Sequence, residues 1–194
     1  MADTINTLNH YKLPAFAQPE ARALLNTLAA AYAVALGEDE IAVMLDAIRW
    51  HQPFYIQLAF SKLRGLIKEQ PEALLAELIE QAADRMIQPG EDNDFHYWEE
   101  RLSIQLPQAD AGHCVALLGQ ASATPEGERP ELLLAALHER IPQATGEEAR
   151  QTFIRLRDIL LRDAYWVADE RGDAKRYRFL LEPLRRWWSR RNAL

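Results

Sequence analysis

The apolar residues of the first half of the chain recur three or four positions apart, which is the spacing of an amphipathic helix. Proline or glycine separates each apolar stretch from the next and therefore marks the ends of helices. The pattern predicts four helices, over residues 19–36, 38–50, 53–70 and 72–87. Tyr32 belongs to the apolar stripe of the first range, and Phe54 belongs to that of the third.

The strongest break in the helical pattern is the segment 89–94, Pro-Gly-Glu-Asp-Asn-Asp. Proline, glycine and four polar residues that avoid helix interiors occur here in one run. We expect a domain boundary at this segment, which divides the chain into a helical domain over 1–88 and a second domain over 89–194.

Helical periodicity returns in the second domain, with a short helix around Tyr97 and longer ones over 110–121, 131–141 and 147–162. The helix over 147–162 has a clear apolar stripe with polar residues opposite it. Its predicted buried residues are Ala149, Phe153, Leu156 and Leu160, and its predicted exposed residues are Gln151, Arg155, Asp158 and Arg162.

The end of the chain changes from helical to strand-like character. Residues 165–170 and 176–180 are rich in aromatic and β-branched residues, and the Arg-Gly-Asp-Ala run at 171–174 supplies a turn between them. A helix that feeds a two-stranded wing is the second half of a winged helix-turn-helix, and a short closing helix with Trp187 and Trp188 follows. The predicted fold is mainly α: a helical bundle followed by a winged helix-turn-helix.

The net charge of −7 is unevenly distributed along the 194 residues. Residues 148–194 contain twelve lysines and arginines against seven acids, a net of +5, so residues 1–147 carry −12. A basic end can bind phosphate or an acidic partner, whereas an acidic body repels nucleic acid at long range. The chain has one cysteine, Cys114, and lacks a long apolar run or a leader segment, so we expect a buried thiol in a cytoplasmic protein without a membrane span.

The residues that usually form catalytic or cofactor sites do not occur in the usual patterns. None of the eight glycines belongs to a phosphate-binding loop, the five histidines form no metal-binding pair, and no nucleophile motif surrounds a serine. We therefore expect no enzyme activity, no cofactor and no metal site in this chain.

Three short segments, in the same order, resemble the C-terminal part of STAND-class, AAA+-related ATPases of archaea and bacteria. Residues 13–25, Leu-Pro-Ala-Phe-Ala-Gln-Pro-Glu-Ala-Arg-Ala-Leu-Leu, are similar to the family's entry into its helical lid. Residues 51–58, His-Gln-Pro-Phe-Tyr-Ile-Gln-Leu, are similar to its lid motif, although His51 replaces a glycine. Residues 176–188, Arg-Tyr-Arg-Phe-Leu-Leu-Glu-Pro-Leu-Arg-Arg-Trp-Trp, are similar to its final strand and helix.

This resemblance implies a lid followed by a winged helix, without the P-loop core of the ATPase. In the family the lid proline packs against adenine, which would make Pro53 the nucleotide contact; the alternative is that Pro53 only begins a helix. The resemblance also implies a regulatory or adaptor role, with a protein partner or an ATPase core as the partner. Whether the chain is part of a larger ATPase or acts by itself stays open.

Two functions follow from these observations. The first is a protein-interaction module, which the acidic body favours. The second is a DNA-binding winged helix, in which the helix and wing would bind phosphate. The cations that would serve it are Arg150, Arg155, Arg157, Arg162, Lys175, Arg176 and Arg178, with acids close to each. A further group would bind an acidic surface, that of a partner or of a neighbouring copy in a homo-oligomer: Arg185, Arg186, Arg190 and Arg191.

Overall fold

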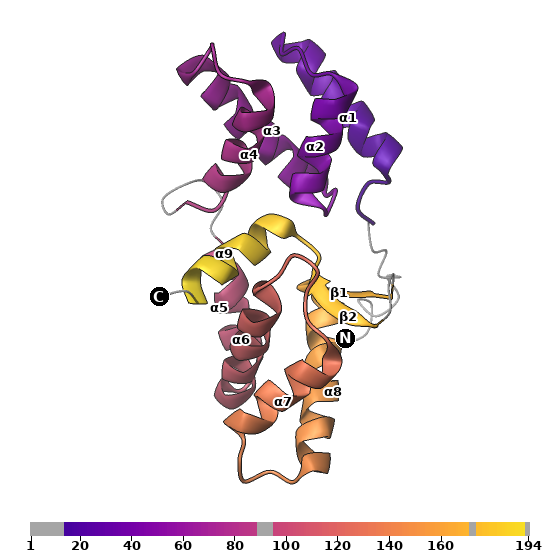
Figure 1. Cartoon of the computed structure of the whole chain (residues 1–194), viewed down its shortest axis with the longest axis vertical. Helices are drawn as coiled ribbons and strands as arrows, with labels where there is room; N and C mark the ends of the chain where they lie inside the picture. The colour runs from indigo at the N-terminus through magenta and orange to yellow at the C-terminus, as the bar shows by residue number, and fades with distance from the viewer. Residues whose placement is uncertain (1–13, 89–94, 171–173, 193–194) are drawn as a thin grey trace, which may run out of the picture.

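The computed structural model describes residues 14–88, 95–170 and 174–192, and these form two halves stacked end to end (Figure 1). The first half is a bundle of four helices: α1 (Gln18–Tyr32), α2 (Glu38–Ile48), α3 (Pro53–Glu69) and α4 (Leu75–Arg85). The second half contains α5 (His96–Gln105), α6 (Gln108–Ser122), α7 (Pro130–Arg140), α8 (Gly146–Arg162), β1 (Trp166–Asp169), β2 (Arg176–Phe179) and α9 (Glu182–Asn192). The fold is mainly helical with a two-stranded wing, as the sequence predicts.

The ends of the bundle helices follow from local backbone chemistry. Pro19 and Pro53 lie in the first turns of α1 and α3, where the missing N–H leaves no helical hydrogen bond unmade. α1 ends at Tyr32, four residues before the predicted end, because Ala33 adopts the left-handed conformation at φ 54°. α4 begins at Leu75 rather than at residue 72, because a turn after Pro71 comes first.

The core of the bundle is formed by one apolar face of each helix, although two aromatic residues of the predicted stripes lie outside it. Tyr32 and Phe54 are 51% and 58% exposed. The largest fully buried side chains of this half include Leu25, Ile41, Met44, Leu45, Ile48, Ile56 and Phe60.

The second half has the arrangement of a winged helix-turn-helix. Helices α6, α7 and α8 are followed by the antiparallel hairpin β1–β2, in which Trp166 pairs with Phe179 and Asp169 with Arg176. The loop before α7 joins this sheet through one bridge. The N–H of Glu128 donates to the Tyr177 carbonyl at 3.0 Å, and the Tyr177 N–H donates back at 2.9 Å.

Gly127 makes this third contact with the sheet sterically feasible. Its φ is +75°, a conformation that favours glycine, and a Cβ at this position would lie 2.5 Å from the Arg178 Cα. No side chain fits between the loop and β2 at this point.

Helix α8 begins with a capping box and buries the predicted stripe. The Thr145 N–H donates to the Glu148 carboxylate at 2.7 Å, and the Glu148 N–H donates to the Thr145 hydroxyl at 3.3 Å. Its buried residues are Ala149, Phe153, Leu156 and Leu160, and Gln151, Arg155, Asp158 and Arg162 are exposed, as predicted.

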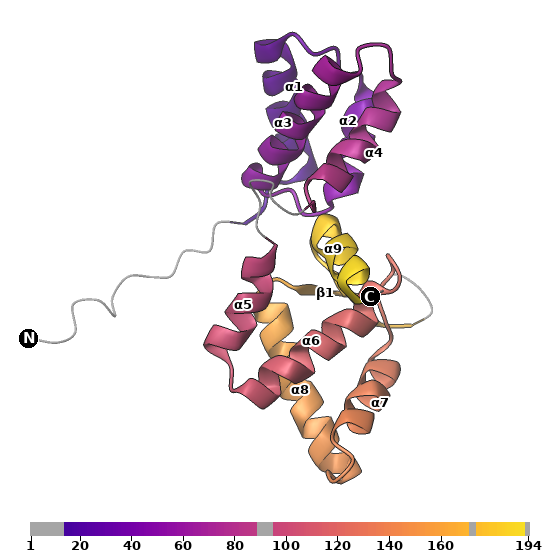
Figure 2. The ribbon, with the colours of Figure 1, turned by 90° about the vertical axis from the view of Figure 1, so that its left-hand side faces the viewer.

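Helix α9 lies between the bundle and the rest of the winged helix, and it packs on both (Figure 2). Trp188 is fully buried next to Phe179, and its indole N–H donates to the Val115 carbonyl at 3.4 Å. Trp187 is only partly buried, so the two tryptophans differ in the way that their adjacent positions on a helix predict. Buried apolar residues of both halves belong to one continuous cluster.

Two predicted features lie outside the described residues: the boundary at 89–94 and the turn at 171–173 of the wing. Among the residues that are described, no helix combines the length and apolar character needed to cross a bilayer. Cys114 is fully buried, as predicted, and this burial raises the pKa of its thiol to about 12.

Candidate functional site

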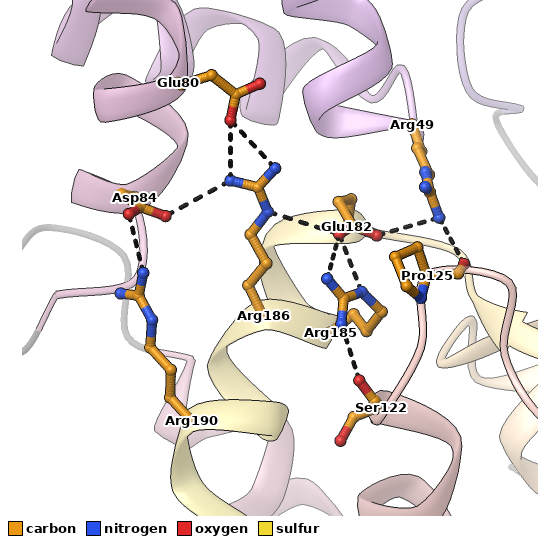
Figure 3. A network of polar contacts seen from close by, with 9 residues as sticks. All are labelled: Arg49, Glu80, Asp84, Ser122, Pro125, Glu182, Arg185, Arg186 and Arg190. Atoms are coloured by element: carbon orange, nitrogen blue, oxygen red, sulfur yellow. Dashed lines mark hydrogen bonds and ion pairs between the residues drawn. The ribbon is translucent and has the colours of Figure 1, made fainter. Parts of the chain in front are cut away.

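The contacts between the two halves form the most elaborate polar site in the described part of the chain, and α9 is at their centre (Figure 3). Arg186 on α9 lies 3.3 Å from Glu80 and 3.5 Å from Asp84, both on α4. One turn further along α9, Arg190 lies 2.9 Å from the other oxygen of Asp84. The basic face of α9 is therefore bound to the acidic end of α4.

Glu182, in the first turn of α9, is the buried centre of this network. Its side chain is only 5% exposed, and its carboxylate is 2.6 Å from Arg185, 3.1 Å from Arg49 and 3.5 Å from Arg186. A buried carboxylate requires such compensation because its hydration is lost. Its position at a helix N-terminus adds a favourable interaction with the helix dipole.

Two of these arginines also bind the end of α6 and the loop that follows it, which adds a third element to the junction. The Arg185 guanidinium donates to the Ser122 carbonyl at 2.8 Å, and the Arg49 guanidinium donates to the Pro125 carbonyl at 2.8 Å. Arg49 therefore connects the end of α2 in the bundle with both α9 and the α6–α7 loop of the winged helix (Figure 3).

The backbone of Arg49 is strained. Its φ is +63° and its ψ is −44°, and the Trp50 N–H donates to the Ile48 carbonyl at 2.8 Å, which closes a tight three-residue turn. A non-glycine residue in such a region costs on the order of 1 to 3 kcal/mol and persists only where its surroundings hold it. Here Glu182 and Pro125 hold the side chain.

An aromatic contact joins the halves beside the ionic one. The ring of Trp50, between α2 and α3, meets the ring of Trp98 on α5 edge-on at 6.4 Å. Trp98 in turn contacts Tyr165 at 5.0 Å, and the Tyr165 hydroxyl donates to the Trp98 carbonyl at 2.5 Å. Burial raises the pKa of Tyr165 to about 12, so it stays a hydrogen-bond donor.

A polar cavity of about 540 Å³ lies beside Arg49, between the bundle and the wing. Residues of both signs line it: Asp46 of α2, Arg49 directly after α2, Arg178 and Asp169 of the wing, and His51. Arg178 and Asp169 form an ion pair of 2.9 Å, so part of this charge is already compensated. Across the described ranges, no group of three or more His, Cys, Asp or Glu could hold a metal ion.

Pro53, the nucleotide contact implied by the family resemblance, begins α3 and is partly buried. It does not line this cavity, whereas His51 does. Of the lid-like motif at 51–58, His51 therefore lies at the cavity, and Pro53 lies outside its lining.

Three of the four α8 arginines expected to bind phosphate are paired with carboxylates. Arg155 binds Asp110 of α6 through two hydrogen bonds of 2.6 and 2.8 Å, which lower the pKa of that carboxyl. Arg157 pairs with its neighbour Asp158, and Arg162 pairs with Asp163. Arg150 is exposed and forms no ion pair with any residue that the structure describes.

The cations of the wing also have partners in the same chain. Lys175 lies 3.1 Å from Glu170, Arg178 pairs with Asp169, and Arg176 donates to the Gly127 carbonyl at 3.2 Å. Five of the seven cations predicted to bind phosphate are thus paired with acids, and Arg176 is hydrogen-bonded to a carbonyl.

The four arginines of α9 bind acids of their own chain, whereas the sequence led us to expect the acidic surface of a partner or of a neighbouring copy. Arg185 and Arg186 bind Glu182, Arg186 and Arg190 bind α4, and Arg191 lies 2.8 Å from Glu99 on α5.

Sequence reasoning missed the other members of this junction: Arg49, Glu80, Asp84 and Glu182. One signal was present for Glu182, since it is a single carboxylate within the apolar run Phe-Leu-Leu-Glu-Pro-Leu at 179–184. An acid in such a run is expected to need a buried cation. Comparison with known proteins adds no assignment, because no family model, curated protein or solved structure matches this chain.

Proposed function

We propose that this chain is a non-catalytic regulatory module that interacts with proteins, and that α9 holds its winged helix against its helical bundle. One observation carries the proposal. Of the eleven cations that could serve DNA or partner binding, nine are ion-paired within the chain and a tenth, Arg176, binds a carbonyl. Among the described residues, Arg150 alone of the eleven has none of these partners.

This pairing disfavours DNA as the ligand on physical grounds. Binding to DNA gains free energy by replacing counterions on phosphates with lysine and arginine. An arginine that is already neutralised gains little, and its carboxylate partner would lie close to the phosphate and repel it. Asp110, Asp158 and Asp163 each stand beside an α8 arginine in this way.

The junction gives such a module a physical means of regulation. Strain at Arg49 and the buried Glu182 add polar contacts to the apolar contacts that join the two halves. A partner that binds one half can alter these contacts. The family resemblance names the nucleotide-binding core of an ATPase as the partner to expect, and we place the module, with its buried thiol, in the cytoplasm.

The competing function is DNA binding, which the winged-helix arrangement and the exposed Arg150 near the start of α8 favour. A titration of the purified chain against labelled duplex DNA, at low and at moderate salt, separates the two functions. We expect no sequence preference and no binding at moderate salt. Sequence-selective binding that Arg150→Ala weakens would instead establish the DNA-binding function.

The regulatory role can be tested with a variant that weakens the contact between the two halves. The full chain and the variant Arg186→Glu with Arg190→Glu are each used to isolate partners from the native host. A protein that binds the two forms with different affinity supports a regulated interaction module. The same set of proteins, bound equally by both forms, would contradict the regulatory part of the proposal.

A further inference from the structure

A groove runs along the outer face of the bundle beside α1 and α3. Two adjoining cavities of about 370 and 320 Å³ form it, and both are lined by Tyr32 of α1 and Arg64 of α3. The larger cavity continues past the end of α3 to the start of α4. In Figures 1 and 2 this end of the bundle points away from α9.

The walls of this groove are largely apolar and include the two aromatic residues that the helical stripes would have placed in the core. Phe54 is 58% exposed and Tyr32 is 51% exposed. Partly buried aliphatic residues continue the surface between and beyond them, namely Leu28, Leu58, Ile67 and Leu75. Large exposed apolar residues gathered in a groove are typical of a surface that another molecule covers.

The charge of the groove is of one sign. Among the described residues, the charged ones that line it are Arg64 and Lys68, and no described acid lines either cavity. Arg64 lies 3.5 Å above the centre of the Tyr32 ring. Neither cation forms an ion pair with a described residue, in contrast to most arginines of the junction and wing.

We propose that this groove binds an acidic amphipathic helix of a protein partner. The apolar side chains of that helix would lie against Phe54, Leu58 and Tyr32, and its carboxylates would pair with Arg64 and Lys68. Helix α3, which forms the floor, has 17 residues and a length of about 25 Å, enough for a partner helix of several turns. The proposal rests on the proposed function only in that the partner is a protein.

The test is a selection from a phage-displayed library of random helical peptides on the intact chain. The groove should enrich peptides with apolar residues three and four positions apart and with Asp or Glu beside them. Binding of the best peptide, measured by fluorescence anisotropy, should weaken at least about tenfold in Phe54→Ser. The control is Leu132→Ser, which removes a similarly exposed apolar residue (51%) from α7 and should leave the affinity unchanged.

Reversal of charge gives the sharper result. The variant Arg64→Glu with Lys68→Glu should select peptides rich in Lys or Arg instead of acidic ones, because the apolar residues of the groove are unchanged. Circular dichroism shows whether each variant is folded, and the exposure of these side chains leads us to expect native helix content.

Three outcomes would overturn the proposal. The first is a selection that yields no peptide whose binding Phe54→Ser weakens. The second is a charge-reversed variant that selects the same acidic peptides as the parent. The third is self-association that Phe54→Ser abolishes, since it would assign the groove to a second copy of this chain. The groove shares no residue with α8 or the wing, so a positive DNA titration would refute the proposed function without affecting this result.

Discussion

Arg49 and Glu182 lie 3.1 Å apart across the junction of the two halves. The arginine follows α2 in a strained turn, and the glutamate begins α9, 133 positions further along the chain. Among the described residues, Glu182 is the acid of the winged half that pairs with Arg49, and Arg49 is the cation of the bundle that pairs with Glu182, so this pair links the turn after α2 directly to the closing helix.

Loss of the Glu182 charge should be strongly destabilising, because three arginines converge on it. We expect Glu182→Gln to lower the free energy of unfolding by about 3 kcal/mol, the typical result of removing one member of a buried ion pair. Urea denaturation followed by circular dichroism measures this. As a control, Glu38→Gln removes an exposed partner of Arg22 and should cost less than about 1 kcal/mol. Equal effects of the two substitutions would contradict the central role of Glu182.

Reversal of charge on α9 should weaken its contact with α4. In Arg186→Glu with Arg190→Glu, acids face Glu80 and Asp84, which are about half exposed, so we expect a moderate loss of roughly 1 to 2 kcal/mol or about 4 °C in Tm. Adding Glu80→Arg and Asp84→Arg should restore the contact with α4, but not the cation that Arg186 places 3.5 Å from the buried Glu182. Thermal denaturation at low and at high salt measures the difference in Tm between variant and parent. Screening by salt should reduce this difference. An equal difference at the two salt concentrations would speak against an ionic origin.

Substitution of Gly127 should destabilise the wing. In Gly127→Ala the Cβ meets β2 in a left-handed backbone, so we expect a loss of about 2 kcal/mol or more in the free energy of unfolding. Gly112→Ala is the matched control, since this glycine lies exposed within α6 and its Cβ would meet nothing. That variant should be about 0.5 kcal/mol more stable than the parent. Urea denaturation of both variants decides the matter.

The pair of Arg155 and Asp110 should contribute to stability at neutral pH and lose this contribution in acid. The Arg155 hydrogen bonds hold the pKa of Asp110 below its usual range, so the carboxylate stabilises the fold above the unfolded pKa of about 4. The contribution disappears as the pH falls through the lowered value. Because Arg155 is half exposed, we expect Asp110→Asn to cost less than about 1 kcal/mol at pH near 7.

The measurement for this pair is the free energy of unfolding as a function of pH. Asp110→Asn and the parent should converge in acid, where the parent carboxyl is protonated. A constant difference between them at every pH would mean that the substitution acts through packing rather than through charge.

Periodicity predicted the parts of the fold that depend on neighbours along one helix. The four-residue stripe of α8 from Ala149 to Leu160 is buried as expected, and the winged helix follows from the hairpin after it. The same reasoning cannot tell a core position from a groove position, because Tyr32 and Phe54 keep the spacing of their helices and yet remain exposed. Spacing reports one face of a helix, and only the packing of other helices decides whether that face is covered.

The junction could not be predicted for a different reason. The partners of Arg186 and Arg190 lie on α4, which is distant in sequence. Arg49 has a positive φ although it is not a glycine, so its residue type does not indicate this conformation. Charge composition indicated a basic end and an acidic body, but it could not indicate whether they would bind each other within one chain.

The position of α9 has a kinetic consequence. Arg186 and Glu80 are 106 residues apart in sequence, and α9 packs on α6 and on α2, which lie in different halves. Contacts between distant residues form slowly because a long loop must close first. Helices of the bundle should therefore assemble early during refolding, and the burial of Trp188 should follow as a slower phase of tryptophan fluorescence. The joining of the two halves would then be the final step in reaching the native state.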